Sequence, residues 1–339
     1  MVTLSQRINT LEALGAYLSN FDENNSEYKT FVEAIEKAHQ ENGWFKKEEC
    51  RHAIASWGVA LKKEKIQEWL TPYELKENQN PKTIALVLAG NLPMVGFHDL
   101  LAVWISGNNA LVKCATKDKV LIPFLVNSNP ILKSMTRFTE EKLEGFEAVI
   151  ATGSNNAARY FDYYFAKYPS VIRKNRNGVA VLNGKETAAE LKGLGRDMLQ
   201  YFGLGCRNVS KLYLPKGYDL NQVFGGIYPL SKCIEVNKYA NNYDYNKAVF
   251  LMSEFDFVEN GFFMLKEDTA LSSPIASAFY EYYDSPEQLK KQLEEQKDDI
   301  QCVVTNEAYA NAVPFGHTQM PELWDYADGV DTIEFLKTL

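Results

Sequence analysis

A cysteine follows two glycines in the stretch Gly203-Leu204-Gly205-Cys206-Arg207-Asn208, which separates a predicted helix from a predicted strand. Glycine accepts backbone conformations that other residues avoid, so the chain can turn sharply here and present the thiol to a substrate. Arg207 would favour the thiolate if its guanidinium points towards the sulfur, and the thiolate is the form that attacks a carbonyl carbon. Cys206 is therefore a candidate nucleophile. The alternative interpretation is a small buried residue at a crowded turn.

The other cysteines lack this setting. Cys114, Cys233 and Cys302 lie in or beside apolar runs typical of a core, and Cys50 follows charged residues typical of a helix surface. The five cysteines are widely separated and contain no C-x-x-C pair, so neither a disulfide framework nor a structural zinc site is expected. The four histidines show no H-E-x-x-H spacing, which also argues against a metalloenzyme.

A second candidate is the asparagine in Gly90-Asn91-Leu92-Pro93, directly after the apolar run of residues 83–89. Such a run predicts a buried parallel strand, and open α/β sheets bind ligands at the carboxyl ends of their strands. The amide of Asn91 could donate a hydrogen bond to a developing oxyanion, which contributes on the order of 3 kcal/mol when preorganised. The alternative is a turn-forming asparagine ahead of a proline.

A third candidate is Thr152-Gly153-Ser154, between a predicted strand at 148–150 and a predicted helix. Backbone amides at a helix N-terminus favour a phosphate group. An ordinary N-cap has the same pattern, so this signal is weak by itself. The chain contains no full G-x-G-x-x-G, and the usual dinucleotide fingerprint is therefore missing.

Strands and helices alternate along most of the chain. Residues 4–71 show apolar residues at helical spacing and predict three helices. We expect strands at 83–89, 110–112, 148–150, 178–182, 210–214, 248–251, 275–282 and 302–304, and helices at 94–105, 121–135, 155–168, 187–202 and 286–296. The pattern predicts an α/β protein with two doubly wound domains, preceded by the helical segment and divided near residue 175.

Composition excludes several classes of protein. The chain has 339 residues, 46% hydrophobic and 24% charged, which suits two globular domains. A formal net charge of -8 gives no overall attraction to nucleic acid or to an anionic membrane. No stretch approaches the roughly 20 apolar residues of a membrane span, and residues 1–7 do not look like a signal peptide, so we expect a cytoplasmic protein.

Taken in order, four segments resemble the aldehyde dehydrogenase superfamily, and within it the LuxC-like acyl-CoA reductases. Leu88-Ala89-Gly90-Asn91-Leu92-Pro93 is similar to the strand end with the oxyanion-hole asparagine, and Gly203-Leu204-Gly205-Cys206 to the G-Q-x-C nucleophile loop. Residues 103–113 (VWISGNNALVK) are similar to A-L-A-A-G-N-x-V-V-x-K, and Ala151-Thr152-Gly153-Ser154 to F-T-G-S. The likeness runs from about residue 70 to the C-terminus.

The resemblance implies an aldehyde dehydrogenase-like fold and a role for each segment. Residues 1–70 would be a helical segment packed on the cofactor domain, and 71–175 a Rossmann-like nicotinamide-cofactor domain. Residues 176–315 would be the catalytic domain, and 316–339 a C-terminal segment. Cys206 would be the nucleophile and Asn91 the oxyanion donor. Lys113 would contact the cofactor's adenosine ribose, and Thr152, Gly153 and Ser154 would lie near its pyrophosphate.

The departures from the family pattern change the expected chemistry. In aldehyde-oxidising members, a glutamate in an E-L-G-G-K segment activates the water that hydrolyses the acyl-enzyme. The matching residues 172–177 contain no acidic side chain. An acyl group on Cys206 should therefore survive long enough to be reduced. This favours a long-chain fatty acyl-CoA reductase that converts an acyl-CoA or acyl-carrier thioester to an aldehyde with NAD(P)H.

Two further departures bear on the cofactor. Thr116, followed by Lys117, stands where the family has a ribose-binding glutamate, which favours NADPH, with NADH still open. Residues 270–275 lack the glutamate that holds the nicotinamide ribose. The missing glutamates leave open a catalytically silent relative that binds acyl groups or a partner protein. A third possibility is a thiol acyltransferase, or thioester hydrolysis at Cys206, without redox chemistry. A homodimer is also expected from the resemblance, without a residue pattern that establishes it.

Overall fold

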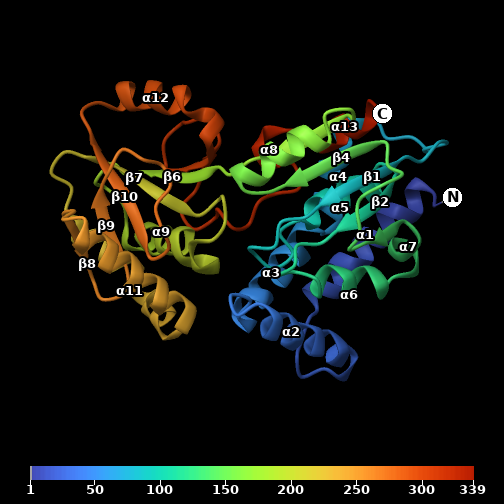
Figure 1. The fold of residues 1–339 in the computed structure, drawn as a ribbon, viewed down its shortest axis with the longest axis horizontal. Coiled ribbons are helices and arrows are strands. Elements are labelled where there is room, and N and C mark those ends of the chain that lie inside the picture. The colour runs from blue at the N-terminus through green and yellow to red at the C-terminus, as the bar shows by residue number, and fades with distance from the viewer. Residues whose placement is uncertain (1) are drawn as a thin grey trace. The chain divides into compact units, whose positions relative to one another are not determined.

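The computed structural model describes residues 2–339. The chain forms two compact units (Figure 1). The first unit comprises Met1–Asn175 together with Pro321–Leu339, and the second unit comprises Arg176–Met320. The sequence places divisions after residues 70, 175 and 315. In the structure the N-terminal helices belong to the first unit, and the chain returns to that unit from Pro321 onwards.

The first unit contains a parallel five-stranded sheet in the order β3-β2-β1-β4-β5. Its strands are β1 (Thr83–Val87), β2 (Asn109–Lys113), β3 (Thr136–Phe138), β4 (Ala148–Thr152) and β5 (Ser170–Arg173). Ile84, Ala85 and Leu86 are fully buried, because helices cover both faces of such a sheet. The sequence does not predict β3 and β5, which are short edge strands without a continuous apolar run.

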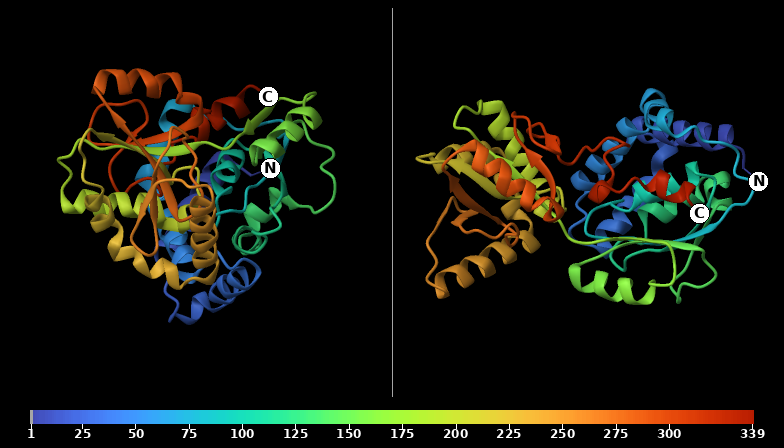
Figure 2. Two further views of the ribbon diagram at one scale, coloured as in Figure 1. Left: turned by 60° about the vertical axis from the view of Figure 1, so that its left-hand side comes forward. Right: turned by 90° about the horizontal axis from the view of Figure 1, so that it is seen from above.

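Nine α-helices of the described residues belong to the first unit. They are α1 (Leu4–Ser19), α2 (Lys29–Glu41), α3 (Lys47–Ala60), α4 (Lys63–Leu70), α5 (Phe97–Ile105), α6 (Leu121–Asn127), α7 (Pro130–Ser134), α8 (Asn155–Tyr164) and α13 (Thr332–Lys337). Right-handed crossovers that leave the centre of a sheet in opposite directions put their helices on opposite faces. Figure 2 accordingly shows α8 across the sheet from the N-terminal helices.

Two helix predictions in this unit are wrong in detail. The N-terminal segment forms four α-helices and not three, because the chain leaves the helical conformation at Leu61 and Lys62. The helix predicted at 121–135 is divided into α6 and α7. Asn129 is extended there and caps α7 through the backbone amides of Ile131 and Leu132, and Pro130, which has no amide hydrogen, occupies the first helical position.

Buried polar contacts fix the C-terminal residues to the first unit. Arg173 at the end of β5 forms an ion pair with Asp99 on α5 and donates to the Thr332 hydroxyl, 2.9 Å away. The Tyr326 hydroxyl accepts a 2.7 Å hydrogen bond from Trp69 Nε1 and lies 2.7 Å from the Tyr73 hydroxyl. The segment therefore belongs to the core of this unit.

The second unit contains a seven-stranded sheet in the order β12-β11-β6-β7-β10-β9-β8. Its strands are β6 (Asn177–Val181), β7 (Val209–Pro215), β8 (Phe257–Glu259), β9 (Met264–Glu267), β10 (Ser277–Tyr283), β11 (Ile300–Val304) and β12 (Ala312–Val313). Only β8 runs antiparallel to its neighbour among the described strands. The α-helices are α9 (Ala188–Leu199), α10 (Leu220–Ile227), α11 (Asn237–Met252) and α12 (Pro286–Glu295).

The strand predicted at 248–251 is wrong, since these residues form the last turn of α11. A four-residue apolar run does not distinguish a strand from part of a helix. The helix buries Tyr239, Tyr243, Asn246 and Phe250, which follow one another at helical spacing, while Leu251 is exposed. Tertiary packing of that face decided the conformation. Apart from this run and the details above, the α/β architecture with an N-terminal helical segment is confirmed.

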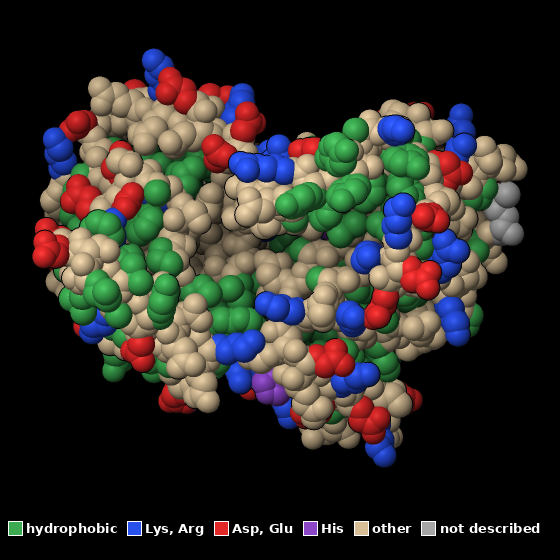
Figure 3. Space-filling view, viewed as in Figure 1, with side chains coloured by type: hydrophobic (Ala, Val, Ile, Leu, Met, Phe, Trp, Pro, Cys, Tyr) green, Lys and Arg blue, Asp and Glu red, His purple; other side chains and the backbone are tan. Residues whose placement is uncertain are grey.

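Helix α8 carries aromatic residues on two faces. Phe161 on the helix and Phe165 directly after it pack against the apolar cluster around Val149. Tyr160, Tyr163 and Tyr164 are 65%, 80% and 66% exposed. Figure 3 shows hydrophobic side chains gathered on the surface over this helix.

Candidate active site

Cys206 lies in the turn between a 3-10 helix (Gln200–Gly203) and strand β7 of the second unit. Its side chain is partly buried, in contrast to Cys302 and Cys50, which are 1% and 0% exposed. All five cysteines are among the described residues, and none forms a disulfide. The predicted nucleophile is therefore on a loop with access to solvent.

The backbone before Cys206 is strained. Tyr201, Phe202 and Gly203 have φ angles of 53°, 59° and 75°, all in the left-handed region. This region suits glycine and is costly for aromatic residues, and such strain persists only where the surrounding structure enforces it. Tyr201 and Phe202 are both 6% exposed, so their buried rings help to impose the turn. Strained backbone of this kind clusters at functional sites.

The buried side chain of Asn208 holds the cysteine turn together. Its Oδ1 accepts a 2.8 Å hydrogen bond from the Gly205 amide. Its Nδ2 donates to the carbonyl oxygens of Asp197 at 3.0 Å and Gln200 at 2.9 Å. One amide group therefore links the end of α9, the strained turn and the residue before Cys206.

Hydrogen bonds also connect the end of α9 and the Cys206 turn to residues 316–318. The carboxylate of Asp197, 1% exposed, accepts hydrogen bonds from the Gly316 amide at 2.6 Å and from the Thr318 amide and hydroxyl at 3.0 and 2.9 Å. Arg207 Nε donates to the Thr318 carbonyl oxygen at 2.6 Å. Burial raises the pKa of Asp197 to about 6, against the opposing effect of its hydrogen bonds. The Arg207 side chain thus helps to hold the Cys206 turn against residues 316–318.

Three other thiols are poor nucleophiles for a physical reason. Burial raises the pKa of Cys50 and Cys114 to about 12 and that of Cys233 to about 11. Thiols with such pKa values stay protonated near neutral pH, and the protonated form does not attack carbonyl carbon. Cys50, Cys114 and Cys233 are therefore poorly suited to nucleophilic attack.

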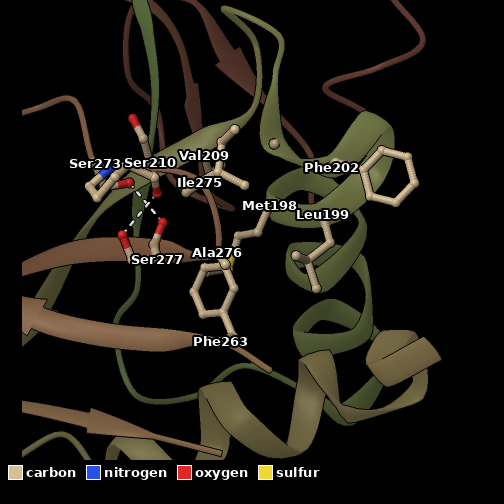
Figure 4. Close-up of a pocket in the computed structure, with 12 residues that line it drawn as sticks. Met198, Leu199, Phe202, Val209, Ser210, Phe263, Ser273, Ile275, Ala276 and Ser277 are labelled. Atoms are coloured by element: carbon tan, nitrogen blue, oxygen red, sulfur yellow. Dashed lines mark hydrogen bonds between the residues drawn. The ribbon is translucent and has the colours of Figure 1, made fainter. Parts of the chain in front are cut away.

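A pocket opens beside the cysteine turn (Figure 4). Gly203 and Val209, which flank Cys206 in the sequence, form part of its wall. The end of α9 and residues 273–277 form other parts. Its cavity volume is about 20 Å³, which is room for one or two water molecules. It lies entirely within the second unit.

The remaining predicted site residues lie at one edge of the first unit's sheet. Asn91 is exposed in the loop after β1, Lys113 is the last residue of β2, and Thr152 is the last residue of β4. The register pairs Val87 of β1 with Lys113 on one side and Ala151 on the other. The carboxyl ends of these three neighbouring strands therefore bring Asn91, Lys113 and Thr152 to one edge. Cys206 belongs to the second unit.

A buried carboxyl group supports the Asn91 loop. Asp118 is 4% exposed, and its Oδ2 accepts a 3.2 Å hydrogen bond from the amide of Met94, whose φ is 56°. Its buried Oδ1 has no hydrogen-bond partner within residues 2–339. Burial raises the pKa of Asp118 to about 7. A Cβ at Gly90 would lie 2.5 Å from that of Ala115, so the two loops are closely packed.

The edge of this sheet has groups that suit a dinucleotide. Ser154 caps α8 by accepting a 3.3 Å hydrogen bond from the Ala157 amide. A Cβ at Gly153 would lie 2.8 Å from Ala157, so the chain is compact where a pyrophosphate would approach. Lys113 is partly buried and donates to the Glu141 carbonyl oxygen at 3.0 Å, while Thr116 and Lys117 are exposed. Positive charge, a hydroxyl and a helix N-terminus fit phosphate and ribose groups.

The segments that lack the family glutamates have other roles in the structure. In residues 172–177, Arg173 is buried in its ion pair with Asp99. Residues 270–275 approach the wall of the pocket beside Cys206, and the Ala270 amide donates to Asp268 Oδ1 at 2.9 Å.

Sequence reasoning missed the supports of both loops. Asp197, Thr318 and Asp118 act through contacts between residues that are distant in the chain or hidden in the core. Asn208 stands within the cysteine motif, and an asparagine just before a strand is a turn signal, but its three partners are visible only in the fold.

Within residues 2–339, no group of three or more His, Cys, Asp or Glu side chains is arranged to hold a metal ion. None of the helices in this part of the chain has the length and apolar character needed to cross a membrane.

Comparisons with known proteins identify the fold. No family model matches the chain. Aldehyde dehydrogenase 21 from Physcomitrella patens, solved with succinate, matches with a TM-score of 0.65 and 13% identity over 100% of this chain and 84% of that structure. An aldehyde dehydrogenase from Bacillus cereus, solved with NAD+, matches with a TM-score of 0.62 and 10% identity over 90% of this chain and 72% of that structure.

A curated protein adds a likeness in sequence. Long-chain acyl-protein thioester reductase from Aliivibrio fischeri is 22% identical over 228 residues, which are 60% of this chain and 47% of that protein. The match thus spans about half of the relative's length.

The fold defined by these observations is that of the aldehyde dehydrogenase superfamily. In sequence the chain is similar to a long-chain acyl-protein thioester reductase. The resemblance stated from the sequence motifs is therefore confirmed at both levels.

Proposed function

We propose that this chain is an NAD(P)H-dependent acyl reductase that converts an acyl thioester to an aldehyde through an acyl group held on Cys206. The observation that carries the proposal is the setting of Cys206. It is partly buried on a strained turn that Asn208 and Asp197 fix. A residue held in this way is presented for chemistry.

The first half of the reaction is acyl transfer to sulfur. The Cys206 thiolate attacks the acyl carbonyl carbon and forms a carbon–sulfur bond. The negative charge passes to the carbonyl oxygen, where the Asn91 side chain and the Cys206 backbone amide donate hydrogen bonds. Collapse of this intermediate breaks the bond to the donor thiol, which leaves as a thiolate and takes up a proton. The products are an acyl-enzyme and free donor thiol.

The second half is reduction. A nicotinamide cofactor, once bound, would supply a hydride, which carries the two electrons needed to take an acyl thioester to the aldehyde level. The oxygen that accumulates charge is again held by Asn91 and the Cys206 amide. The carbon–sulfur bond then breaks, the aldehyde leaves, and Cys206 returns to the thiolate. No acidic residue occupies 172–177 to activate water, which favours reduction of the acyl-enzyme over its hydrolysis.

The cofactor is assigned to the edge of the first unit's sheet. We propose that Lys113 and Thr116 bind the adenosine ribose, and that Thr152, Gly153 and Ser154 lie against the pyrophosphate. Lys117 is exposed beside Thr116 while the next residue in the chain, an aspartate, is buried, and an exposed cation at this position suits a 2′-phosphate. NADPH is thus the proposed cofactor, with NADH as the alternative. Residues 71–175 would then be the cofactor domain and 176–315 the catalytic domain.

The acyl donor is coenzyme A or an acyl-carrier protein, and the long-chain class is suggested by the name of the Aliivibrio fischeri relative. A homodimer and a cytoplasmic location stay predictions from the sequence.

The decisive test replaces the nucleophile. Cys206→Ala should lower NADPH oxidation with a fatty acyl-CoA by at least ~10³-fold, because the covalent route is lost. It should also abolish the acyl adduct that electrospray mass spectrometry detects on wild-type protein. Cys233→Ala is the matched control and should keep both. An undiminished rate in Cys206→Ala would overturn the proposal.

The same assays separate the two alternatives. A silent relative would give no thermal shift with NADP(H) or NAD(H). A thiol acyltransferase would release coenzyme A from acyl-CoA at the same rate with and without cofactor.

A further inference from the structure

The loop that carries Asn91 is anchored on both sides of this residue. Before Asn91, the Leu88 amide donates to the Lys113 carbonyl oxygen at 3.1 Å. After it, the Met94 amide donates to Asp118 Oδ2 at 3.2 Å. Both acceptors lie in residues 113–118, at the end of β2 and in the loop that follows it. The position of Asn91 therefore depends on this neighbouring segment.

The two loops are in close contact at Gly90, directly before Asn91. A Cβ added at Gly90 would lie 2.5 Å from the Cβ of Ala115 and 3.2 Å from that of Asp118. Gly90 does not have a positive φ, so the position requires a residue without a side chain and not one with unusual backbone freedom. Asp118 thus contacts the Asn91 loop at Gly90 and again at Met94.

Asp118 is suited to this contact as a neutral acid. It is 4% exposed, and burial raises its pKa to about 7 against the opposing effect of the Met94 hydrogen bond. A protonated carboxyl group still accepts a hydrogen bond through its carbonyl oxygen, and it buries no charge. The thiols of Cys50 and Cys114 interact electrostatically with Asp118, and burial raises the pKa of both to about 12, so they stay neutral as well.

We propose that Asp118 is a positioning residue, which holds the Asn91 side chain in place for the oxyanion through the backbone at Gly90 and Met94. The inference rests on the proposed function for the role of Asn91. A displacement of about 1 Å at a reacting centre can cost about 10²-fold in rate, so loss of this support should appear in kcat. The Asp118 amide also donates to the Ala115 carbonyl oxygen at 3.0 Å, and this backbone bond does not depend on the side chain.

Removal and replacement of the carboxyl group test the inference. Asp118→Ala should lower kcat with a fatty acyl-CoA by roughly 10- to 100-fold, with the KM values for acyl-CoA and NADPH within about threefold of wild type. Asp118→Asn keeps a neutral side chain with an oxygen acceptor for the Met94 amide, and its kcat should stay within about threefold of wild type. Equal losses in the two variants would overturn the inference.

A double-mutant cycle separates positioning from general destabilisation. In an Asn91→Ala background, Asp118→Ala should lower kcat by less than about twofold more, because the group that it positions is gone. Leu11→Ala is the control, since Leu11 is fully buried on α1 of the same unit, and its loss should lower the melting temperature while kcat is kept. A full additional loss in the Asn91→Ala background contradicts the inference.

The Gly90 contact provides a test that leaves Asp118 unchanged. Gly90→Ala should force the Asn91 loop away from Ala115 and lower kcat by roughly tenfold or more. Ala115→Gly in the same protein removes the closest contact and should recover most of that loss, and Ala115→Gly alone should keep the wild-type kcat. An undiminished kcat in Gly90→Ala, or a loss that Ala115→Gly does not relieve, contradicts the inference.

The order of the loop can be measured without catalysis. Hydrogen–deuterium exchange in the peptide of residues 89–97 should be at least about tenfold faster in Asp118→Ala than in wild type, and unchanged in Asp118→Asn. Equal exchange in Asp118→Ala and wild type would show that Asp118 does not hold the loop. If wild type reduces no acyl thioester, the proposed function fails, and the exchange rates still decide whether Asp118 fixes the Asn91 loop.

Discussion

Reactive groups are positioned in different ways at the edge of the first unit's sheet and at the Cys206 turn of the second unit. Asn91, Lys113 and Thr152 come after or at the ends of neighbouring parallel strands, so regular strand pairing is enough to gather them. Cys206 stands on an irregular turn with three consecutive left-handed residues, which buried polar groups hold from both sides.

Two asparagines make the contrast concrete. Asn91 is exposed in its loop, so its side chain can be reached by a ligand. Asn208 is 3% exposed and engages three backbone groups, so its amide serves the turn. A regular sheet edge can therefore vary its exposed polar residues at little cost in stability, whereas the nucleophile turn depends on each support.

Asn208→Ala should have the largest effect on stability. It leaves the Gly205 amide and the Asp197 and Gln200 carbonyl oxygens without this partner, and we expect a loss of roughly 3–5 kcal/mol of unfolding free energy. Acylation of Cys206 should fall in parallel, because the turn relaxes. Urea unfolding and adduct mass spectrometry measure the two effects. A stable, fully active variant would show that the turn keeps its conformation without the Asn208 side chain.

Asn91→Ala should have the opposite profile, with a large effect on rate and a small one on stability. We expect kcat to fall by about 10²–10³-fold, through loss of one oxyanion donor, while stability changes by no more than about 1 kcal/mol. Steady-state kinetics and thermal melts provide the measurements. Asn80→Ala, an exposed asparagine ahead of β1, is the control and should change neither quantity. A rate near that of wild type would show that Asn91 does not act in the active site.

Asp118→Asn tests the raised pKa of the carboxyl group that is buried beneath the Asn91 loop. Its pKa is raised to about 7 by burial, against an ordinary value of 3.8. The folded state therefore keeps the proton where the unfolded chain has released it. The stability that this provides is complete below pH 3.8 and is lost as the pH rises to about 7.

From pH 5 to pH 8 the wild type should lose about 2–3 kcal/mol from this group, and Asp118→Asn should lose correspondingly less. Urea unfolding at both pH values measures the difference. Asp298→Asn, at an exposed acidic residue, is the control and should follow the wild type. Identical pH dependence in Asp118→Asn and wild type would contradict a raised pKa.

Lys113→Met should have the smallest effect, confined to cofactor binding. We expect the KM for NADPH to rise about fivefold with kcat nearly unchanged, because a partly exposed charge contributes only about 1 kcal/mol to binding. Lys119→Met, whose exposed ammonium pairs with Glu140 on the same side of the unit, serves as the control. Equal KM values in both variants would show that Lys113 does not contact the cofactor and that other residues do.

Much of the sheet edge was predictable from the sequence. The apolar run at 83–89 indicated a buried strand, and the glycine and asparagine after it indicated a loop at the carboxyl edge. The short strands β3 and β5 and the helical state of residues 248–251 were not predictable, since three to five residues carry too little pattern to choose between conformations.

Residue types and their spacing were enough to identify which side chains can do chemistry and which strand ends carry them, because residue type and hydrophobic period are local properties. The glycines before Cys206 singled it out in the same way. The folded chain alone revealed that Tyr201 and Phe202 adopt left-handed conformations, that Asn208 and Asp197 fix the turn, and that other thiols are held protonated by burial. These features depend on contacts between distant residues and on exclusion of water, which no short stretch of sequence encodes.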